Sequence, residues 1–361
     1  MLSTPPLPCT MQAAIFHAPG DVRMETVPVP QLQPGELLVR VDAALTCGTD
    51  LKCYRRGHPV LLGQLPSPFG HEGAGTIVAT TPQSTTPEGG LWQPGQRVVF
   101  ANSAPCGTCH ACMRGRENLC ESLALLNGTY AQYIRIPERI AQRNTYALAD
   151  TCPAVIAAFA EPLADALRGI SVMQLQPGQS LLVMGLGPIG QLMVRAAKHQ
   201  GLHVVATARS AHKVVMAQTF GGADAVVQGD VLGTETQDQL RALSPHGQGF
   251  DGVIEAIGQP ASWQVAVDLV CRGGVVNWYG GCPSGTTVTL DTRRLHYDDI
   301  RLVSPFHHTP AFFAQAVQWL NSGQLDPSPL ISQTVPLAKV VDGLEAMASG
   351  EAIKVALTMP H

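Results

Sequence analysis

The strongest constraint on the fold is an alternation of short apolar runs and helix-length segments between residues 178 and 304. The apolar runs read SLLVM, HVVAT, AVV, DGVIEA, VVNWY and IRLV. Strands joined by helical crossovers favour a parallel sheet with helices on both faces. We therefore predict an α/β chain with a doubly wound, nucleotide-binding domain over residues 161–304.

The segment before this domain has a different character. Residues 1–160 contain short runs rich in β-branched and aromatic residues, such as ELLVRVDAAL, GAGTIVAT, QRVVFA and AQYIRI, broken by glycine and proline. This spacing predicts a small, barrel-like β domain. After Pro305, two amphipathic segments (310–323 and 336–350) predict helices and IKVALTM predicts a strand. This tail is too short to be a domain, so we expect residues 305–361 to complete the first one.

Composition and charge exclude several classes of function. The 361 residues are 45% hydrophobic and carry a net charge of only −4, with no block of lysine and arginine, so we expect no nucleic-acid partner. No run approaches the roughly 20 apolar residues of a membrane-spanning helix. The first ten residues resemble a loose tail rather than a secretory signal. Together with ten cysteines, this favours a reducing, cytoplasmic compartment.

A glycine-rich turn follows the first strand of the predicted parallel sheet. Gly185, Gly187 and Gly190 form a GxGxxG pattern, with Pro188 and Ile189 between the last two. The first glycine permits a tight turn, the second admits a pyrophosphate, and the third lets the helix pack close to the strand. The pyrophosphate then lies at the helix N-terminus. The pattern predicts a dinucleotide site.

The end of the next strand bears on the choice of cofactor. An NAD site usually carries a carboxylate there, which binds the ribose 2′-hydroxyl. This chain instead has Arg209 and Ser210, followed by Lys213. Arginine binds phosphate well and the hydroxyl can add a hydrogen bond. We therefore favour NADP over NAD, the alternative being that Arg209 simply faces solvent.

Potential metal ligands are scattered through the first domain. Cys47 lies in TCGTDLK, His71 and Glu72 lie in PFGHEGAG, and Glu161 lies in FAEPLADAL. Thiolate, imidazole and carboxylate together suit zinc that keeps an open or exchangeable position. Glu161 precedes Pro162, so we expect a break from helical backbone there, with the carboxylate pointing into a cavity.

At these residues the chain resembles the zinc-containing medium-chain dehydrogenases, in the alcohol and polyol dehydrogenase superfamily. The matching motifs are CGTD (47–50), GHE (70–72), a four-cysteine segment (106–120), EPLA (161–164) and GLGPIG (185–190), and they occur in family order. Glu-Pro at 161–162 and FHHTP at 306–310 are most similar to the sorbitol and threonine dehydrogenase branch. The resemblance implies a GroES-like catalytic domain interrupted by a Rossmann nucleotide-binding domain.

The resemblance also implies roles for residues around the metal. Cys47, His71 and Glu161 would ligate a catalytic zinc ion. Glu72 would lie beside or on the metal, and could exchange with water or with Glu161. Asp50 would orient His71 by holding one nitrogen of its ring.

Three further residues would serve the reaction and the cofactor. Thr49 would bind the substrate oxygen and begin the path by which the proton leaves. Lys354 matches a basic position that contacts cofactor phosphates in relatives. Many relatives have a proton-relaying histidine where this chain has Lys52, which could relay a proton or contact the cofactor instead.

Cys106, Cys109, Cys112 and Cys120 have the spacing C-x2-C-x2-C-x7-C. A bacterial iron–sulfur motif more typically ends C-x3-C-P, and a reducing compartment disfavours disulfides. Four thiolates in one short loop can surround zinc with no open position, which makes such a site structural. The family's structural-zinc lobe has the same spacing, so we predict a second zinc site here.

These observations predict a zinc-dependent, NAD(P)-linked dehydrogenase that interconverts an alcohol and its ketone or aldehyde. Polyols and secondary alcohols are the expected substrates, and a homodimer or homotetramer is the expected assembly. One alternative is an NADPH-dependent reductase of a larger biosynthetic carbonyl compound. Another is a non-catalytic cofactor-binding protein, which the intact set of zinc ligands disfavours.

Overall fold

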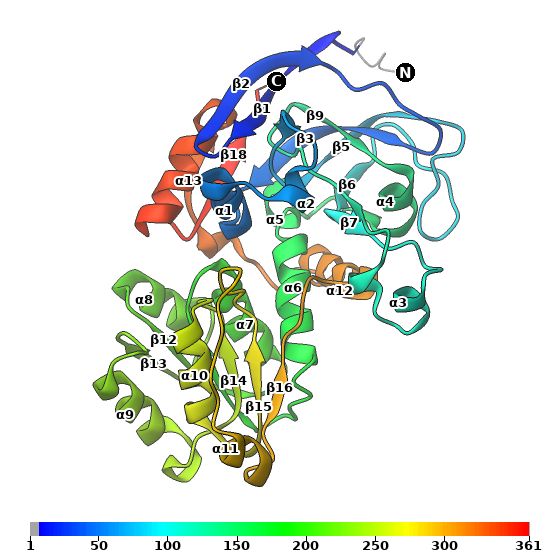
Figure 1. Cartoon of the computed structure of the whole chain (residues 1–361). Helices are drawn as coiled ribbons and strands as arrows, with labels where there is room; N and C mark the ends of the chain where they lie inside the picture. The colour runs from blue at the N-terminus through cyan, green and yellow to red at the C-terminus, as the bar shows by residue number, and fades with distance from the viewer. Residues whose placement is uncertain (1–6, 361) are drawn as a thin grey trace. The chain divides into compact units, whose positions relative to one another are not determined.

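The computed structural model describes residues 7–360 (Figure 1). Residues 1–6, part of the predicted tail, lie outside the described residues. The described chain divides into two compact units. Unit 1 contains the chain up to Glu161 together with the segment from Thr309 onward, and unit 2 contains Pro162–His308. The domain boundaries predicted from the sequence lay between residues 160 and 161 and between residues 304 and 305.

Unit 2 is built on a parallel sheet with the strand order β13-β12-β11-β14-β15-β16. Every run predicted as a strand forms one: β11 (Ser180–Met184), β12 (His203–Ala208), β13 (Ala225–Gln228), β14 (Phe250–Glu255), β15 (Val270–Trp278) and β16 (Arg301–Val303). The chain starts in the middle, runs to one edge, and then returns to build the other half. This reversal places the end of β11 at the switch point, where α/β sheets bind ligands.

Helices surround this sheet, and most of them bury apolar residues (Figure 1). They are α6 (Ala160–Ser171), α7 (Pro188–His199), α8 (Ala211–Thr219), α9 (Thr234–Leu243), α10 (Pro260–Leu269) and the short α11 (Thr292–Tyr297). The buried strands read as continuous apolar runs, as expected of a parallel sheet covered on both sides.

Unit 1 is rich in short strands. A mixed sheet has the order β10-β6-β5-β3-β18-β17, with β9 also paired to β3, and smaller sheets join β2-β1-β4 and β7-β8. The strands are β1 (Thr10–Ala18), β2 (Asp21–Pro28), β3 (Leu37–Leu45), β4 (Ser67–Pro68), β5 (Glu72–Thr80), β6 (Arg97–Phe100), β7 (Ser103–Ala104), β8 (Ala124–Leu125), β9 (Tyr133–Ile136) and β10 (Thr145–Ala147). Short helices connect the strands of unit 1. They are α1 (Gly48–Arg56), α2 (Pro59–Leu62), α3 (His110–Met113), α4 (Glu138–Arg143) and α5 (Ala154–Ala157).

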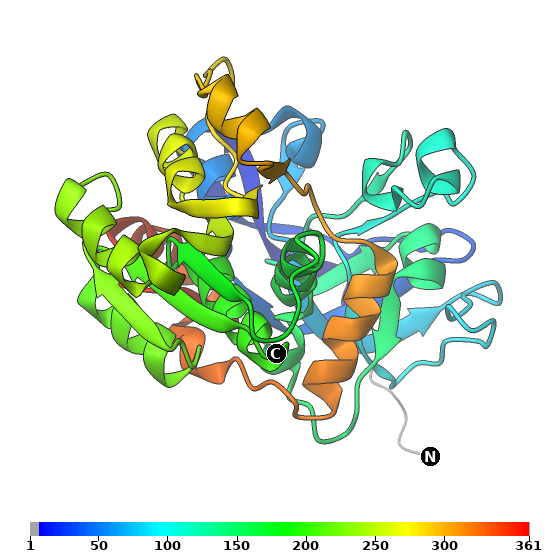
Figure 2. The same cartoon turned by 90° about the horizontal axis from the view of Figure 1, so that it is seen from below.

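The C-terminal segment joins the sheet of unit 1. It forms α12 (Pro310–Asn321), β17 (Ile331–Pro336), α13 (Val340–Ser349) and β18 (Lys354–Thr358). β18 pairs antiparallel with β3, so that Ala356 lies opposite Leu45. Figure 2 shows α12 as the orange helix, which packs against α5. The sequence predicted both helices and β18, whereas β17 has no alternating pattern that would have revealed it.

The expected helix break at Glu161 is wrong. Glu161 and Pro162 are the second and third residues of α6. Proline is tolerated in the first turn of a helix, because the N–H groups there have no partner within the helix. Glu161 is therefore helical although it precedes a proline, because Pro162 lies in the first turn of α6.

Among residues 7–360, no helix is long and apolar enough to cross a membrane.

We predict that Gly190→Ala destabilises unit 2, because a Cβ atom at Gly190 would lie 2.0 Å from the carbonyl oxygen of Gly185. Overpacking against backbone typically costs about 1–3 kcal/mol. Gly187→Ala is the matched control, since a Cβ at Gly187 meets no atom within 4 Å and its φ is −71°. Urea denaturation should show a lower free energy of unfolding for Gly190→Ala and little change for the control; equal values would contradict the close packing.

Candidate functional site

Cys47 is held at the N-terminus of α1 by a capping box. Its Sγ accepts a hydrogen bond from the Thr49 amide at 3.4 Å, and Asp50 Oδ2 accepts one from the Cys47 amide at 3.1 Å. These bonds satisfy amides that a helix start would otherwise leave unpaired. The motif TCGTD therefore fixes the direction of both the thiol and the carboxylate.

Asp50 also orients His71, which lies immediately before β5. The Nδ1–H of His71 donates to Asp50 Oδ1 at 2.8 Å, and both side chains are buried. With Nδ1 engaged, Nε2 is the ring nitrogen left to bind a metal. The structure thus contains a hydrogen bond through which Asp50 could orient this histidine, and the role of Asp50 at a metal site stays a prediction.

Cys47, His71 and Glu72 converge on one point. Their candidate ligand atoms all lie within 4.8 Å of one another, although Cys47 is far from the other two in sequence. Sulfur, imidazole nitrogen and carboxylate oxygen form a donor set suited to zinc. We refer to these three residues as the Cys47 cluster.

Glu161 lies outside the 4.8 Å grouping of the Cys47 cluster. Its Oε1 accepts a hydrogen bond from Asn102 Nδ2 at 2.8 Å, and its charge helps to raise the pKa of Lys354. The structure therefore brings the predicted ligand set only partly together. Asn102 was missed, because no motif around it signals a partner for a carboxylate 59 residues away.

Lys354 and Glu72 form a fully buried ion pair. Lys354 Nζ lies 2.6 Å from Glu72 Oε1 and 2.5 Å from Oε2, and the side chains are 1% and 0% exposed. The predicted contact of Lys354 with cofactor phosphates stays a prediction, and the structure gives this ammonium group a carboxylate partner. Sequence reasoning missed the pair, because its members are 282 residues apart.

The electrostatics of this region follow from burial and from neighbouring charges. Burial, reinforced by the charge of Glu72, raises the pKa of the Cys47 thiol. Burial opposes protonation of His71, but the Asp50 carboxylate outweighs it and holds the pKa of His71 well above its usual range. A dication would stabilise the thiolate and displace the histidine proton, so the cluster fits a metal whose binding releases protons.

Thr49 and Lys52 lie on α1 beside the cluster. Thr49 is half-buried, one residue after the start of the helix and two residues from Cys47. Lys52 is exposed one turn further along. The structure thus keeps Thr49 next to a candidate ligand and leaves Lys52 accessible to solvent.

The four predicted structural ligands also come together. The Sγ–Sγ distances are 3.9 Å for Cys106–Cys112, 3.5 Å for Cys109–Cys112 and 3.9 Å for Cys109–Cys120. Tetrahedral zinc with Zn–S bonds of about 2.3 Å requires sulfurs about 3.8 Å apart, whereas a disulfide requires about 2.05 Å. The thiols therefore fit a closed zinc site in the lobe that carries α3 (Figure 1).

Backbone amides support this lobe. The amides of Thr108 and Cys109 donate to Cys106 Sγ at 3.4 and 3.3 Å. The backbone amide and the hydroxyl of Thr108, together with the Cys109 amide, donate to the Cys106 thiolate and lower the pKa of Cys106 to about 5. Burial is the largest cause that raises the pKa of Cys112 to about 12. The loop is thus prepared to hold at least one thiolate.

The glycine-rich turn in unit 2 has the geometry that the motif predicts. Gly185 has a φ of +97°, and Gly187 is the N-cap of α7, with Pro188 as its first residue. A Cβ at Gly187 would enter open space, as expected where a phosphate approaches, whereas Gly190 packs directly on Gly185. The turn therefore forms a cradle at the N-terminus of a 12-residue helix.

Buried polar atoms near the same edge of the sheet lack partners among the described residues. They are Thr207 Oγ1 in β12, Glu255 Oε2 at the end of β14 and Gln191 Oε1 in the first turn of α7. Buried polar groups are normally hydrogen-bonded, so this edge fits a polar ligand.

Of the predicted 2′-phosphate residues, Arg209 and Ser210 lie between β12 and α8, and Lys213 lies in the first turn of α8. Arg209 is exposed, Ser210 is the N-cap of α8, and Lys213 is partly buried. Burial lowers the pKa of Lys213 and the charge of Arg209 lowers it further, so the two cations lie close enough to repel each other. An anion between them would relieve this repulsion.

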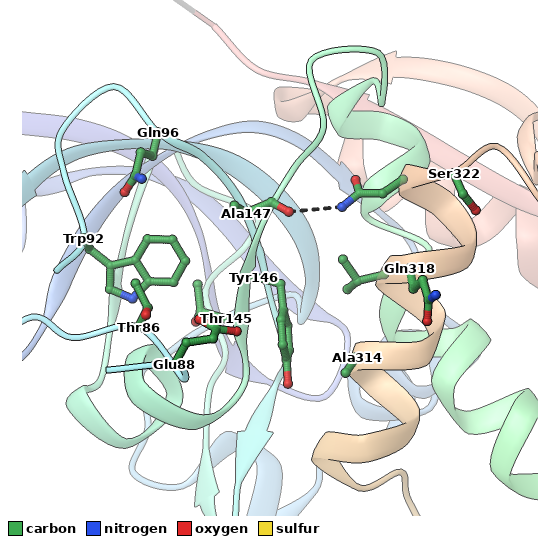
Figure 3. A pocket seen from close by; sticks show the side chains of 12 residues that line it. Thr86, Glu88, Trp92, Gln96, Thr145, Tyr146, Ala147, Ala314, Gln318 and Ser322 are labelled. Atoms are coloured by element: carbon green, nitrogen blue, oxygen red, sulfur yellow. Dashed lines mark hydrogen bonds between the residues drawn. The ribbon is translucent and has the colours of Figure 1, made fainter. Parts of the chain in front are cut away.

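Unit 1 also contains a cavity of about 640 Å³. Trp92 and Tyr146 line one wall, and α12 lines the other with Ala314 and Gln318 (Figure 3). None of the predicted site residues belongs to its lining.

Residues 33–144 match the alcohol dehydrogenase GroES-like domain, and residues 188–322 match the zinc-binding dehydrogenase domain. The chain is 30% identical to an erythritol/L-threitol dehydrogenase from Mycolicibacterium smegmatis, over 97% of this chain and 98% of that one. It is 28% identical to a sorbitol dehydrogenase from Bacillus subtilis, over 94% of each.

Among solved structures, a zinc-binding dehydrogenase from Sinorhizobium meliloti bound to NADP superposes with a TM-score of 0.86. The two are 27% identical, and the match covers 97% of this chain and 100% of the other. The chain belongs to the zinc-containing medium-chain dehydrogenase family. It is an NAD(P)-linked oxidoreductase of alcohols, and the predicted family, GroES-like and Rossmann folds and cofactor classes are confirmed.

We predict that Lys354→Met in this dehydrogenase leaves an unpaired buried carboxylate at Glu72. Breaking a buried ion pair typically costs about 3–5 kcal/mol. The matched control is Lys339→Met, because Lys339 pairs with Asp342 at 3.1 Å on an exposed surface, where a pair contributes at most about 1 kcal/mol.

Urea denaturation of the metal-free proteins, in which zinc does not compensate the charge of Glu72, measures both free energies of unfolding. Adding Glu72→Gln to Lys354→Met should recover part of the loss. A loss no greater than that of the Lys339 control would show that the buried pair does not stabilise unit 1.

Proposed function

We propose that this dehydrogenase oxidises a polyol or another secondary alcohol to its ketone with NADP, and catalyses the reverse reduction. The observation that carries the proposal is the intact Cys47 cluster, because a protein that only bound a nucleotide would not need three converging metal ligands. Relatives named for sorbitol, erythritol or L-threitol, and D-arabinitol support the substrate class.

The reaction converts an alcohol and NADP⁺ into a carbonyl compound, NADPH and a proton. Cys47, His71 and Glu72 would hold the zinc ion, with Glu161 as a further or exchanging ligand. Zinc, when bound, supplies a Lewis acid that lowers the pKa of the substrate hydroxyl. The nicotinamide supplies the hydride acceptor.

The protein's own groups position the substrate and remove its proton. Thr49 would accept the proton of the substrate hydroxyl and pass it toward solvent. Lys52, exposed on the same helix, would relay that proton or contact the cofactor. Asp50 keeps the His71 ring oriented, which would fix the direction of this metal ligand.

The cofactor is proposed to bind along the turn from Gly185 to Gly190, with Pro188 and Ile189 between the last glycines. Arg209, Ser210 and Lys213 would surround the 2′-phosphate. The absence of a carboxylate at the tip of β12 supports NADP, since an acidic side chain there would repel this phosphate. The relative from Sinorhizobium meliloti that binds NADP adds support.

The four-cysteine lobe is proposed to hold a structural zinc ion. Four thiolates leave no position for substrate, so this metal would stabilise the loop without taking part in the reaction. We further propose a homodimer or homotetramer in a reducing, cytoplasmic compartment. The resemblance supports the assembly, and the thiols of the cysteines support the compartment.

We predict that Arg209→Ala weakens NADPH binding about 10- to 100-fold, because a hydrogen bond to a charged group contributes about 1.5–3 kcal/mol. NADH lacks the 2′-phosphate, so its affinity should hardly change. Titrations followed by nicotinamide fluorescence measure both affinities. Equal losses for the two cofactors would show that Arg209 does not contact the 2′-phosphate.

Metal analysis should find about two zinc ions per chain, one for each ligand set. Cys47→Ser should remove one ion and abolish alcohol oxidation. Cys112→Ser should remove the other and lower thermal stability, while the remaining folded protein keeps the zinc ion of the Cys47 cluster. A fully loaded wild-type chain with only one zinc ion would eliminate one of the two sites.

A further inference from the structure

We infer that Tyr130 is a positioning residue for the metal site, and that its hydroxyl and ring together hold His71 in place. This inference rests on the proposed zinc site at the Cys47 cluster. Tyr130 lies just before β9, in the segment NGTYAQY, and carries no motif of its own. No sequence pattern connects it with His71.

The first observation is the hydroxyl. Tyr130 donates a hydrogen bond to Asp50 Oδ2 and lies 3.1 Å from the carbonyl oxygen of Leu45. Asp50 Oδ2 also accepts from the Cys47 amide, and Oδ1 accepts from His71. Donors thus approach Asp50 from three chain segments and leave the carboxylate little freedom to rotate.

The second observation is the ring. A Cβ at Gly70 would lie 2.5 Å from the Tyr130 ring, and Gly70 has a φ of +88°. The backbone directly before His71 therefore passes across the face of this ring. The Tyr130 amide donates to the carbonyl oxygen of Phe69 at 3.0 Å, and the two rings meet edge to face.

Tyr130 therefore contacts both supports of His71. Its hydroxyl contacts the carboxylate that orients the imidazole, and its ring contacts the backbone that carries it. The side chain is fully buried, so water cannot replace a lost hydroxyl contact without space being made. A ligand that is already oriented loses less entropy when it binds the metal, and partners of this kind typically change metal affinity 10- to 100-fold.

Tyr130→Phe separates these two contacts, because it keeps the ring and deletes only the hydroxyl. Tyr133→Phe is the matched control: Tyr133 is only partly buried, lies in β9, and packs in the cluster formed by β1 and β3. Each variant is prepared as the full chain, freed of metal and titrated with zinc against a chromogenic chelator. The four-cysteine site serves as an internal reference in the same sample.

We expect Tyr130→Phe to raise the zinc dissociation constant of the Cys47 cluster about tenfold and to leave the four-cysteine site unchanged. The absorption spectrum of the cobalt-substituted protein should also shift for Tyr130→Phe and not for Tyr133→Phe, since it reports the coordination geometry.

Two results would overturn the inference. One is unchanged affinity and an unchanged cobalt spectrum in Tyr130→Phe, and the other is an equal loss of zinc from both sites, which would indicate general destabilisation. A wild-type chain that binds zinc only at the four cysteines contradicts the proposed function itself. Failure of the proposed zinc site and failure of the proposed role of Tyr130 therefore give different results.

Discussion

The site depends on Asp50, a buried carboxylate that joins otherwise separate parts of unit 1. It receives the amide of Cys47, the ring N–H of His71 and the hydroxyl of Tyr130. Burying a carboxylate is costly unless hydrogen bonds and charges compensate it, and these donors provide that compensation. The same bonds that make the buried charge tolerable also orient the thiol and the imidazole, so the stability of this region and its chemistry have one physical origin.

A buried ion pair connects the C-terminal segment to β5. β18 pairs with β3 and places Lys354 against Glu72, the first residue of β5. A buried ion pair is weak evidence for stability, because desolvation can exceed the attraction between the charges. Its consequence here is positional, because the ion pair with Lys354 Nζ holds the Glu72 carboxylate beside Cys47 and His71. The C-terminal segment therefore contacts a residue of the proposed metal site and also completes the sheet.

Much of this arrangement could be predicted from the sequence, because it depends on local patterns. The strands of unit 2, the glycine turn and the spacing of Cys106 to Cys120 each occupy one short stretch of chain. The helix at Pro162 was mispredicted, since the local preference before proline ignores the permissive first turn of a helix. The contacts of Lys354 with Glu72, Asn102 with Glu161 and Tyr130 with Asp50 could not be predicted, because each joins segments that are distant in sequence and meet only in the folded domain.

The central claim is that the Cys47 cluster makes this protein a zinc-dependent, NADP-linked oxidoreductase of polyols and secondary alcohols. The most direct test is the rate of NADP⁺ reduction, over a panel of such alcohols, as metal-free protein is reloaded with increasing zinc. The account predicts that with at least one alcohol the rate rises in proportion to zinc bound at the Cys47 cluster, and not with zinc bound at the four cysteines. Full activity without zinc in the cluster, or no activity toward any alcohol when both sites are loaded, would contradict it.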